Sequence, residues 1–322
     1  MSLLRVNSVS KQIAEKTIVN NISFEQAPLQ KIAIVGETGS GKSTLLKMIA
    51  GWIQPDAGEL FLETKRIKGP DEKLIPGQKE IAYLSQHFEL RNAYRVEELL
   101  SYANTLTEGE AADLFEVCKI DHLLKRKTDQ LSGGERQRIA IARLLISAPK
   151  LLLLDEPFSN LDLIHKNILK QVIRDIGDRL QITCLMVSHD PHDILAWADE
   201  IIVLKAGNII QQGSPQEVYH HPIDAYAAGL LGIYQLRTQA LEKLFEWSSN
   251  SHQQQFLRPE YFKIVAEGLG IKAVIDRIFF MGGWYELQIT VADTQITLKT
   301  IETSYQKGET VFVQLVLPPI IE

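Results

Sequence analysis

A glycine-rich segment near the amino terminus, GETGSGKST at residues 36–44, matches the pattern G-x-x-x-x-G-K-[ST]. Glycines in such a loop let the backbone approach phosphate groups closely, so that backbone amides bind the phosphate oxygens. The lysine of the pattern, Lys42, would reach the β and γ phosphates of a nucleotide, and the hydroxyl of Ser43 would bind Mg²⁺. The residues that we assign to phosphate binding are Gly36, Glu37, Thr38, Gly39, Ser40, Gly41, Lys42, Ser43 and Thr44.

The segments on either side of this loop decide between phosphate binding and an ordinary glycine-rich turn. Residues 31–35, KIAIV, form a continuous apolar run rich in β-branched side chains, which is typical of a strand buried on both faces. Residues 42–52, KSTLLKMIAGW, predict a helix that ends near Gly51. A strand, a glycine-rich loop and a helix in this order are the context that the pattern requires, so the sequence favours a nucleotide site.

Two adjacent carboxylates, Asp155 and Glu156, follow the apolar run at residues 151–154. Ligands of open α/β sheets bind at the carboxyl ends of the strands, which is where this pair is expected. A pair of acids in this position is often only a solvated turn. With a phosphate loop in the same chain, we instead expect Asp155 to bind magnesium and Glu156 to orient or polarise a water for in-line attack on the γ phosphate.

A third feature, LSGGERQRIAIARLL at residues 131–145, places two glycines directly before a strongly amphipathic helix. A Ser-Gly-Gly turn at the start of a helix offers free backbone N–H groups and the positive end of the helix dipole, which together suit an anion. No phosphate-binding lysine lies beside these glycines. If the turn binds a phosphate, the lysine for that phosphate must therefore come from elsewhere.

Further apolar runs repeat the character of residues 31–35 along the chain, with helical stretches between them. Such alternation predicts a parallel α/β core. Residues 3–12 and 17–26 alternate apolar and polar side chains, as half-exposed antiparallel strands do. Between Gln86 and Leu131 the apolar residues have helical spacing, which predicts a helical insertion. The further strands expected in the core are residues 79–86, 150–157, 182–189 and 200–207.

The pattern changes again from about residue 235 onward. A polar stretch, EWSSNSHQQQ, precedes several short β-like runs with turn signals between them, which suggest a small β-barrel. Within this region, the two glycines of MGGWYE predict a hairpin turn. The strands expected in the barrel are residues 271–279, 284–291, 295–301 and 310–317.

The overall composition limits the possible functions. With 322 residues, 45% of them hydrophobic, the chain is long enough for a large α/β domain and a smaller second one. A formal net charge of -6 argues against binding of nucleic acid through bulk positive charge. Cys118 and Cys184 lack the spacing of a disulfide framework or a zinc site, so we expect reduced thiols in a cytosolic protein. The apolar runs are shorter than the roughly 20 residues of a membrane helix, so a role at a membrane would be peripheral.

Together, the phosphate loop, the LSGGE turn and the acids after residues 151–154 resemble the nucleotide-binding subunit of ATP-binding cassette (ABC) transporters, over residues 1 to about 232. The signature loop of that family reads LSGGQ or close to it. The resemblance implies that two subunits pair head to tail, and that Ser132, Gly133 and Gly134 contact the γ phosphate held by the partner's loop. This arrangement accounts for the missing lysine, and it implies that one chain alone is a poor ATPase.

The same resemblance assigns roles to further residues. Gln86, at the end of IAYLSQ, matches the glutamine that contacts the metal and the attacking water. Asp162, in SNLD, matches the acid of a loop that crosses the dimer interface, and His189, in VSHD, matches a histidine that contacts the γ phosphate. Ile13 occupies the position where the family usually has an aromatic residue that stacks on adenine. Because an aliphatic side chain loses that stacking, of order 1 kcal/mol, we expect weak discrimination between ATP and GTP.

Residues 204–232 and the segment LRPEYFKIV at 257–265 resemble importer ATPases for sugars, polyamines, iron(III) or oxyanions, which carry an oligomer-binding-like (TOBE) barrel at the carboxyl terminus. The tail of this chain is long enough for one such barrel. The predicted domains are an ABC ATPase domain at 1–234 with a helical subdomain at about 87–131, a linker at 235–254, and a barrel for regulation or dimerisation at 255–322.

We therefore expect a P-loop NTPase fold of the ABC cassette type, with a parallel β core, an antiparallel β subdomain, a helical insertion and a small carboxyl-terminal barrel. The expected function is hydrolysis of ATP, with Mg²⁺, that energises solute import in bacteria by closing a homodimer. A soluble or exporter-associated ABC ATPase without a solute-binding protein is the alternative.

The resemblance also implies partners and a location. The expected partners are permease subunits, which would dock on residues 88–100, and indirectly a solute-binding protein, at the cytoplasmic face of the inner membrane. Nucleic acid is not expected as a partner, because strand aromatics are more often barrel core or cross-strand pairs than base-stacking platforms. The aromatic residues in question are Phe279, Phe280, Trp284 and Tyr285.

Overall fold

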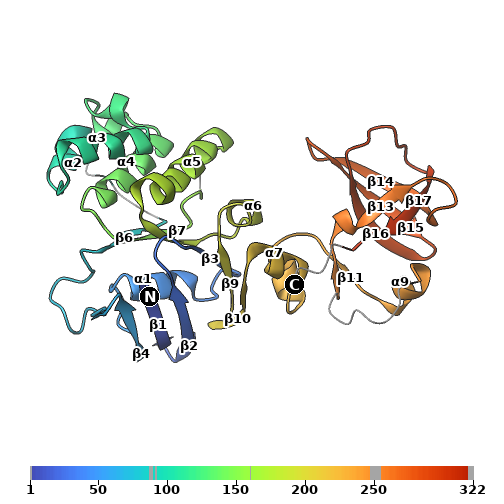
Figure 1. Ribbon diagram of the computed structural model, residues 1–322, viewed down its shortest axis with the longest axis horizontal. Helices are drawn as coiled ribbons and strands as arrows, with labels where there is room; N and C mark the ends of the chain where they lie inside the picture. Colours follow the sequence, from blue (N-terminus) through green and yellow to red (C-terminus); the bar gives the residue numbers. More distant parts are fainter. Residues whose placement is uncertain (1, 87–89, 91–92, 160, 247–254, 318–322) are drawn as a thin grey trace. The chain divides into compact units, whose positions relative to one another are not determined.

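The computed structural model describes residues 2–86, 90, 93–159, 161–246 and 255–317. The chain divides into two compact units, Met1–Pro215 and Gln216–Glu322. Each unit has its own β-sheet and its own hydrophobic core, and the strands and helices of both are labelled in Figure 1.

The central sheet of the first unit contains, in spatial order, β10 (Asn208–Gly213), β9 (Glu200–Lys205), β3 (Lys31–Val35), β8 (Thr183–Val187), β7 (Leu151–Asp155) and β6 (Ile81–Leu84). All neighbouring pairs are parallel except β10 with β9. Strands that are buried on both faces need apolar side chains at every position, which explains the continuous apolar runs of β3, β7 and β8. The predicted parallel core is confirmed, and it brings the carboxyl ends of these three strands to one edge.

A second sheet of the first unit contains, in spatial order, β2 (Lys16–Gln26), β1 (Leu4–Ile13), β4 (Ala57–Leu62) and β5 (Lys65–Arg66). The pairings are antiparallel, as the alternating pattern of the first two strands predicts. Ala14 and Glu15 turn the β1–β2 hairpin with positive φ values of 47° and 64°. The hairpin also packs against the phosphate loop, because a Cβ on Gly41 would lie only 2.4 Å from the carbonyl oxygen of Ile18.

The helices of the first unit are α1 (Lys42–Ile49), α2 (Val96–Ser101), α3 (Glu108–Cys118), α4 (Gly133–Leu145), α5 (Leu163–Leu180) and α6 (Pro191–Ile194). The predicted helical insertion is confirmed by α2 and α3, which are followed by 3₁₀ turns at Asp121–Leu123 and Thr128–Gln130. Figure 1 shows α2, α3, α4 and α5 gathered beside the strands β6 and β7. In the part of the chain that the structure describes, no helix has the length and apolarity needed to span a membrane.

Both cysteines are buried free thiols inside the first unit, Cys118 at the end of α3 and Cys184 on β8. Burial raises the pKa of each thiol to about 12, so both remain protonated at neutral pH. A buried protonated thiol is a poor nucleophile and a poor metal ligand, which agrees with a packing role for both residues.

The second unit begins with the helices α7 (Pro215–His220), α8 (Ala225–Leu230) and α9 (Gln239–Leu244), and with the short paired strands β11 (Gln235–Leu236) and β12 (Phe256–Leu257). Its main sheet contains, in spatial order, β13 (Phe262–Val265), β17 (Thr310–Leu315), β14 (Ile271–Phe280), β15 (Tyr285–Val291) and β16 (Thr294–Thr300). The four predicted strands are present as β14 to β17. The predicted Gly-Gly hairpin is present as well, closed by the N–H of Met281, which donates to the carbonyl of Trp284 at 2.9 Å.

A fully buried arginine joins the first helices of this unit to its barrel. The Arg258 side chain donates Nε and Nη2 to the carbonyl of Tyr219 at 3.1 and 3.0 Å, and Nη1 to the carbonyls of Ala228 and Gly232 at 3.0 Å each. The guanidinium also lies 4.1 Å from the centre of the Tyr219 ring, a cation–π contact. A buried arginine needs this full set of acceptors, so the helices α7 and α8 belong structurally with the barrel.

This packing gives a unit boundary that differs from the one expected from the sequence. The predicted ATPase domain ended at residue 234, whereas the compact units meet after Pro215 because Arg258 holds α7 and α8. The predicted linker at 235–254 is structured over its first part, where α9 buries Leu241 completely in the core of the barrel. The remainder of that linker, residues 247–254, lies outside the described residues.

Candidate active site

The phosphate loop wraps closely around its own lysine. Lys42 is only 6% exposed, and its Nζ donates to the carbonyls of Gly36 at 2.7 Å and Glu37 at 2.8 Å. The loop can turn this tightly because Gly39 and Gly41 have φ values of 85° and 104°, which side chains with a Cβ rarely adopt. The helix α1 begins directly at Lys42, so the amides of its first turn point into the same loop.

The charges around Lys42 show what kind of ligand the loop suits. Burial lowers the pKa of Lys42 from its ordinary value, while the charges of Glu156, Asp155 and Glu37 oppose this shift. The ammonium group of Lys42 therefore lies among backbone carbonyls and nearby carboxylates, with the first-turn amides of α1 beside it. An anionic phosphate would compensate the buried charge and accept hydrogen bonds from those amides.

Both carboxylate oxygens of Asp155 accept hydrogen bonds. Ser43 Oγ donates to Oδ1 at 2.9 Å, and the hydroxyl of Tyr83 donates to Oδ2 at 2.8 Å. Asp155 ends β7, Ser43 begins α1 and Tyr83 lies on the neighbouring strand β6. The predicted pair of oxygen ligands, Ser43 and Asp155, is thus in direct contact.

These oxygens fit magnesium. Mg²⁺ is usually held by one or two protein carboxylates together with substrate phosphates and waters, so a hydroxyl and a carboxylate beside a phosphate loop form a suitable set. Among the described residues, no cluster of three or more His, Cys, Asp and Glu side chains forms a metal site by itself. A magnesium ion bound by Ser43 and Asp155 would take further ligands from the nucleotide phosphates and from water.

Tyr83 is a site residue that the motif analysis missed. Its burial, together with the negative charge and the hydrogen bond of Asp155, raises the pKa of the Tyr83 hydroxyl above its ordinary value. The phenol therefore stays protonated and acts as a permanent donor to Asp155. In the sequence, Tyr83 is marked only by its hydroxyl group, which lies within the otherwise apolar run IAYL of β6.

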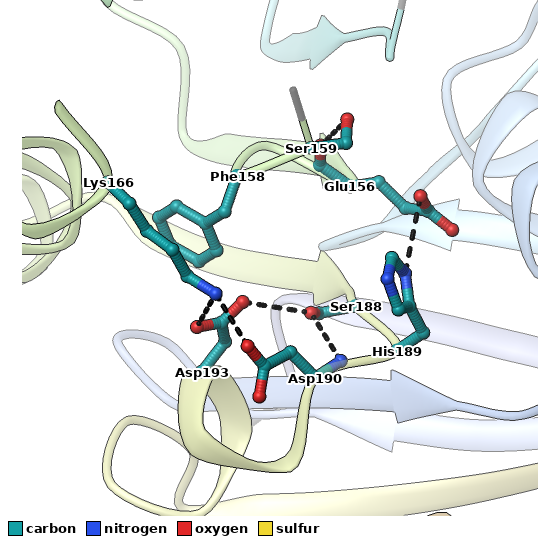
Figure 2. A pocket seen from close by; sticks show the side chains of 8 residues that line it. All are labelled: Glu156, Phe158, Ser159, Lys166, Ser188, His189, Asp190 and Asp193. Atoms are coloured by element: carbon teal, nitrogen blue, oxygen red, sulfur yellow. Dashed lines mark hydrogen bonds and ion pairs between the residues drawn. The ribbon is translucent and has the colours of Figure 1, made fainter. Parts of the chain in front are cut away.

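Two predicted catalytic residues, Gln86 and His189, converge on one carboxylate oxygen of the third, Glu156. Gln86 Nε2 donates to Glu156 Oε2 at 3.3 Å. His189 Nδ1 lies 3.4 Å from the same oxygen, a contact that Figure 2 shows. Gln86, Glu156 and His189 follow β6, β7 and β8 respectively, so the parallel sheet brings them together at its carboxyl edge. Glu156 adopts φ 49° and its N–H donates to the carbonyl of Val187 at 2.9 Å, which fixes its backbone beside β8.

A cluster of ion pairs supports the turn after His189. Lys166 Nζ on α5 lies 2.5 Å from Asp190 Oδ2 and 2.9 Å from Asp193 Oδ1, and Lys170 Nζ lies 2.7 Å from the same oxygen of Asp193. Figure 2 shows Lys166 reaching across Phe158 to both aspartates. The Asp193 side chain is 2% exposed, so its charge needs these two lysines. No motif marks this cluster in the sequence; the available signal is that Lys166 and Lys170 have the spacing of one helix face.

The signature turn begins α4. Ser132 caps the helix by accepting from the N–H of Glu135 at 3.3 Å, while the Glu135 carboxylate accepts from the N–H of Ser132 at 2.8 Å. Ser132 and Gly133 are exposed, whereas Gly134 is buried. Of the interactions found among the described residues, none joins this turn to the phosphate loop of the same chain. Gln137, one turn further along, donates to the carbonyl of Pro157 and so ties α4 to the segment after Glu156.

Two further predicted site residues, Asp162 and Ile13, lie on other elements. Asp162 caps α5 and its carboxylate accepts from the N–H of His165 at 3.0 Å. Ile13 lies at the end of β1 and is 49% exposed. Within the segment 88–100, the expected docking surface, residues 88, 89, 91 and 92 lie outside the described residues.

The contact between Tyr83 and Asp155 yields a test. Tyr83→Phe removes the donor that orients the carboxylate, and loss of such outer hydrogen bonds typically weakens metal binding by about tenfold or more. We expect the Mg²⁺ concentration that half-activates ATP hydrolysis to rise about tenfold. Tyr102→Phe, at a tyrosine that is 76% exposed, is the matched control and should change nothing. An unchanged magnesium dependence in Tyr83→Phe would contradict this role.

Comparisons with known proteins agree with this geometry. A family model described as ABC transporter matches residues 19–159. The sulfate/thiosulfate import ATP-binding protein CysA of Synechocystis sp. is 31% identical over 316 residues, which cover 92% of this chain and 87% of that protein. The Fe(3+) ions import ATP-binding protein FbpC of Photobacterium profundum is 28% identical and covers 91% of this chain and 89% of that protein. A solved dimeric structure of the ATP-binding cassette MJ0796, bound to ADP and Pi, superposes with a TM-score of 0.56 at 25% identity, over 66% of this chain and 98% of that one.

These matches together cover the motifs of the site and nearly the whole chain. The family model covers the phosphate loop, the LSGGE turn and the two acids Asp155 and Glu156, while the CysA and FbpC proteins match over nearly the full length. The resemblance to importer ATPases that the sequence suggested is therefore confirmed, and so is the fold expected from it. The chain belongs to the ABC transporter family, as an importer-type subunit that hydrolyses ATP.

Proposed function

We propose that ATP is hydrolysed at two composite MgATP sites, each formed by the phosphate loop of one copy of this chain and the LSGG turn of a second copy. The observation that carries this proposal is the convergence of Gln86 and His189 on Glu156 Oε2, close to the Ser43–Asp155 pair. This convergence supports our assignment of a water-activating acid, a γ-phosphate sensor and a metal site to one edge of the sheet.

Each residue has a role that its position supports. Lys42 would exchange its two backbone carbonyl acceptors for the β and γ phosphates, while the amides of the loop bind the remaining phosphate oxygens. Ser43 and Asp155 would hold Mg²⁺, which when bound neutralises phosphate charge. Glu156 would accept the proton of the attacking water, and His189 would donate a hydrogen bond to the γ phosphate. Gln86 would orient the same water beside Glu156.

The exposed signature turn supports a role in trans. Ser132 and Gly133 face outward, and a Cβ at Gly133 would meet nothing within 4 Å. Such an open turn at a helix start can receive a phosphate that another subunit brings. The related MJ0796 cassette is described as a dimer bound to ADP and Pi, which agrees with a head-to-tail homodimer in this chain.

The partners follow from the importer-type membership. We infer that the dimer is a peripheral subunit at the cytoplasmic face of a membrane, where its closure drives permease subunits that receive solute from a binding protein. The helical insertion, α2 and α3, is the surface on which we place the permease. The relatives named above import sulfate or thiosulfate and iron(III), and we propose a small solute of the kinds that such importers accept.

The composite site predicts a dependence on protein concentration. ATP hydrolysis by the purified chain should rise more than linearly with protein, because only the dimer is active. Glu156→Gln should lower the rate by about a hundredfold or more, as expected for loss of a general base, and should trap an ATP-bound dimer visible by sedimentation. Glu108→Gln, an exposed acid at the start of α3, is the matched control. Linear hydrolysis by a strict monomer would contradict the composite site.

Ile13 predicts the nucleotide selectivity. Its side chain is exposed at the tip of the β1–β2 hairpin, and Ile18 of the same hairpin lies against the phosphate loop at Gly41. In this position Ile13 could cover the base of a bound nucleotide. We expect similar kcat/KM values for ATP and GTP, and an increase for ATP of about fivefold in Ile13→Tyr, since stacking contributes about 1 kcal/mol. Ile13→Leu keeps an aliphatic contact and serves as the control. A strong preference for ATP that Ile13→Tyr leaves unchanged would refute this role.

A further inference from the structure

A histidine at the start of α5 contacts both the signature turn and Asp162. The backbone N–H of His165 donates to Asp162 Oδ1 at 3.0 Å, and its Nδ1 lies 2.6 Å from Asp162 Oδ2. Both oxygens of this carboxylate are therefore held by one residue, although the Asp162 side chain itself is 63% exposed. Hydrogen bonds from the backbone and the side chain of His165 hold the pKa of Asp162 below its ordinary value, so the carboxylate stays ionised.

The imidazole of the same histidine lies directly against Gly134. A Cβ added to Gly134 would be 2.4 Å from His165 Cδ2 and 2.8 Å from Cγ, so only a glycine leaves room for the ring. The neighbouring Gly133 has no such contact within 4 Å. His165 thus sets how closely the start of α4 approaches the start of α5, and with it the position of the exposed amide of Gly133.

The surface next to this contact is unusually apolar. Leu163 and Ile164, between Asp162 and His165, are each 72% exposed. Burial of these two adjacent apolar side chains by a partner would remove apolar surface from water, which favours association. Leu163 and Ile164 directly precede His165, which contacts Gly134 of the signature turn, so the partner that we assign to this surface is the second copy of the composite site.

We propose that His165 is a positioning residue for ATP hydrolysis, which holds the signature turn and Asp162 in one fixed arrangement so that both meet the second copy together. This inference rests on the composite dimer proposed above. His165 touches neither the water-activating Glu156 nor the phosphate loop in any interaction found among the described residues, so its effect passes through Gly134 and Asp162. Its loss should weaken ATP-driven dimerisation while leaving nucleotide binding by the monomer intact.

Three substitutions at His165 distinguish its contact with Gly134 from its contact with Asp162. His165→Phe keeps a ring against Gly134 but removes the donor to Asp162. His165→Asn keeps an amide N–H near the position of Nδ1 but removes most of the ring. His165→Ala removes both contacts. Asn167→Ala, at an exposed residue on the same helix, is the matched control.

Each substitution is made in the Glu156→Gln background, and the dissociation constant of the ATP-bound dimer is measured by sedimentation. Binding of a fluorescent ATP analogue and the melting temperature are measured on the monomer. We expect at least a tenfold weaker dimer for His165→Ala, intermediate values for His165→Phe and His165→Asn, and no change for Asn167→Ala. Analogue binding and monomer melting should stay close to those of the parent.

Two results would overturn the inference while the dimer proposal stands. In the first, His165→Ala dimerises as tightly as the Glu156→Gln parent. In the second, weaker dimerisation is accompanied by an equal loss of monomer stability and is not partly restored in His165→Asn, which would assign a purely structural role. A Glu156→Gln parent that fails to dimerise would overturn the composite site itself, and the role of His165 with it.

Discussion

The buried charge of Lys42 is the constraint on which the rest of the site depends. Lys42 is only 6% exposed, so its ammonium group must have acceptors, and in this chain they are the carbonyls of Gly36 and Glu37. Such a tight wrap requires glycine at positions with positive φ, and it requires the β1–β2 hairpin to lie against the loop at Gly41. The same charge favours carboxylates nearby and a phosphate as the ligand. The positions of the loop, the hairpin and the acids Asp155 and Glu156 therefore depend on one buried charge.

The parallel sheet brings the predicted catalytic residues together at the carboxyl ends of its strands. Since β6, β7 and β8 run in one direction, residues that follow each strand meet although they are far apart in the chain. Contacts behind this edge hold it in place: Tyr83 orients Asp155, Lys166 and Lys170 balance Asp193 below His189, and Gln137 joins α4 to the segment after Glu156. Binding at the edge is thereby linked to α4 and α5, whose starting turns face outward.

The sequence predicted the strands and motifs of this site because both depend on local pattern. Fully buried strands are continuous apolar runs, and the phosphate loop lies between a strand and a helix, so β3 and α1 follow from spacing alone. The contacts of Tyr83, His165 and Arg258 could not be predicted in this way, since each joins segments that only the folded chain brings together. The unit boundary after Pro215 was missed for the same reason, because α7 and α8 look like a continuation of the first domain.

The central claim is that the LSGG turn works in trans, and mixing two inactive chains tests it most directly. Lys42→Ala disables the phosphate loop and Ser132→Arg blocks the signature turn, so each chain alone should hydrolyse almost no ATP. A mixed dimer contains one site with an intact Lys42 from one copy and an intact Ser132 from the other. The account predicts that the mixture hydrolyses ATP well above the sum of the separate chains. No recovery, under conditions where the two chains associate, would contradict it.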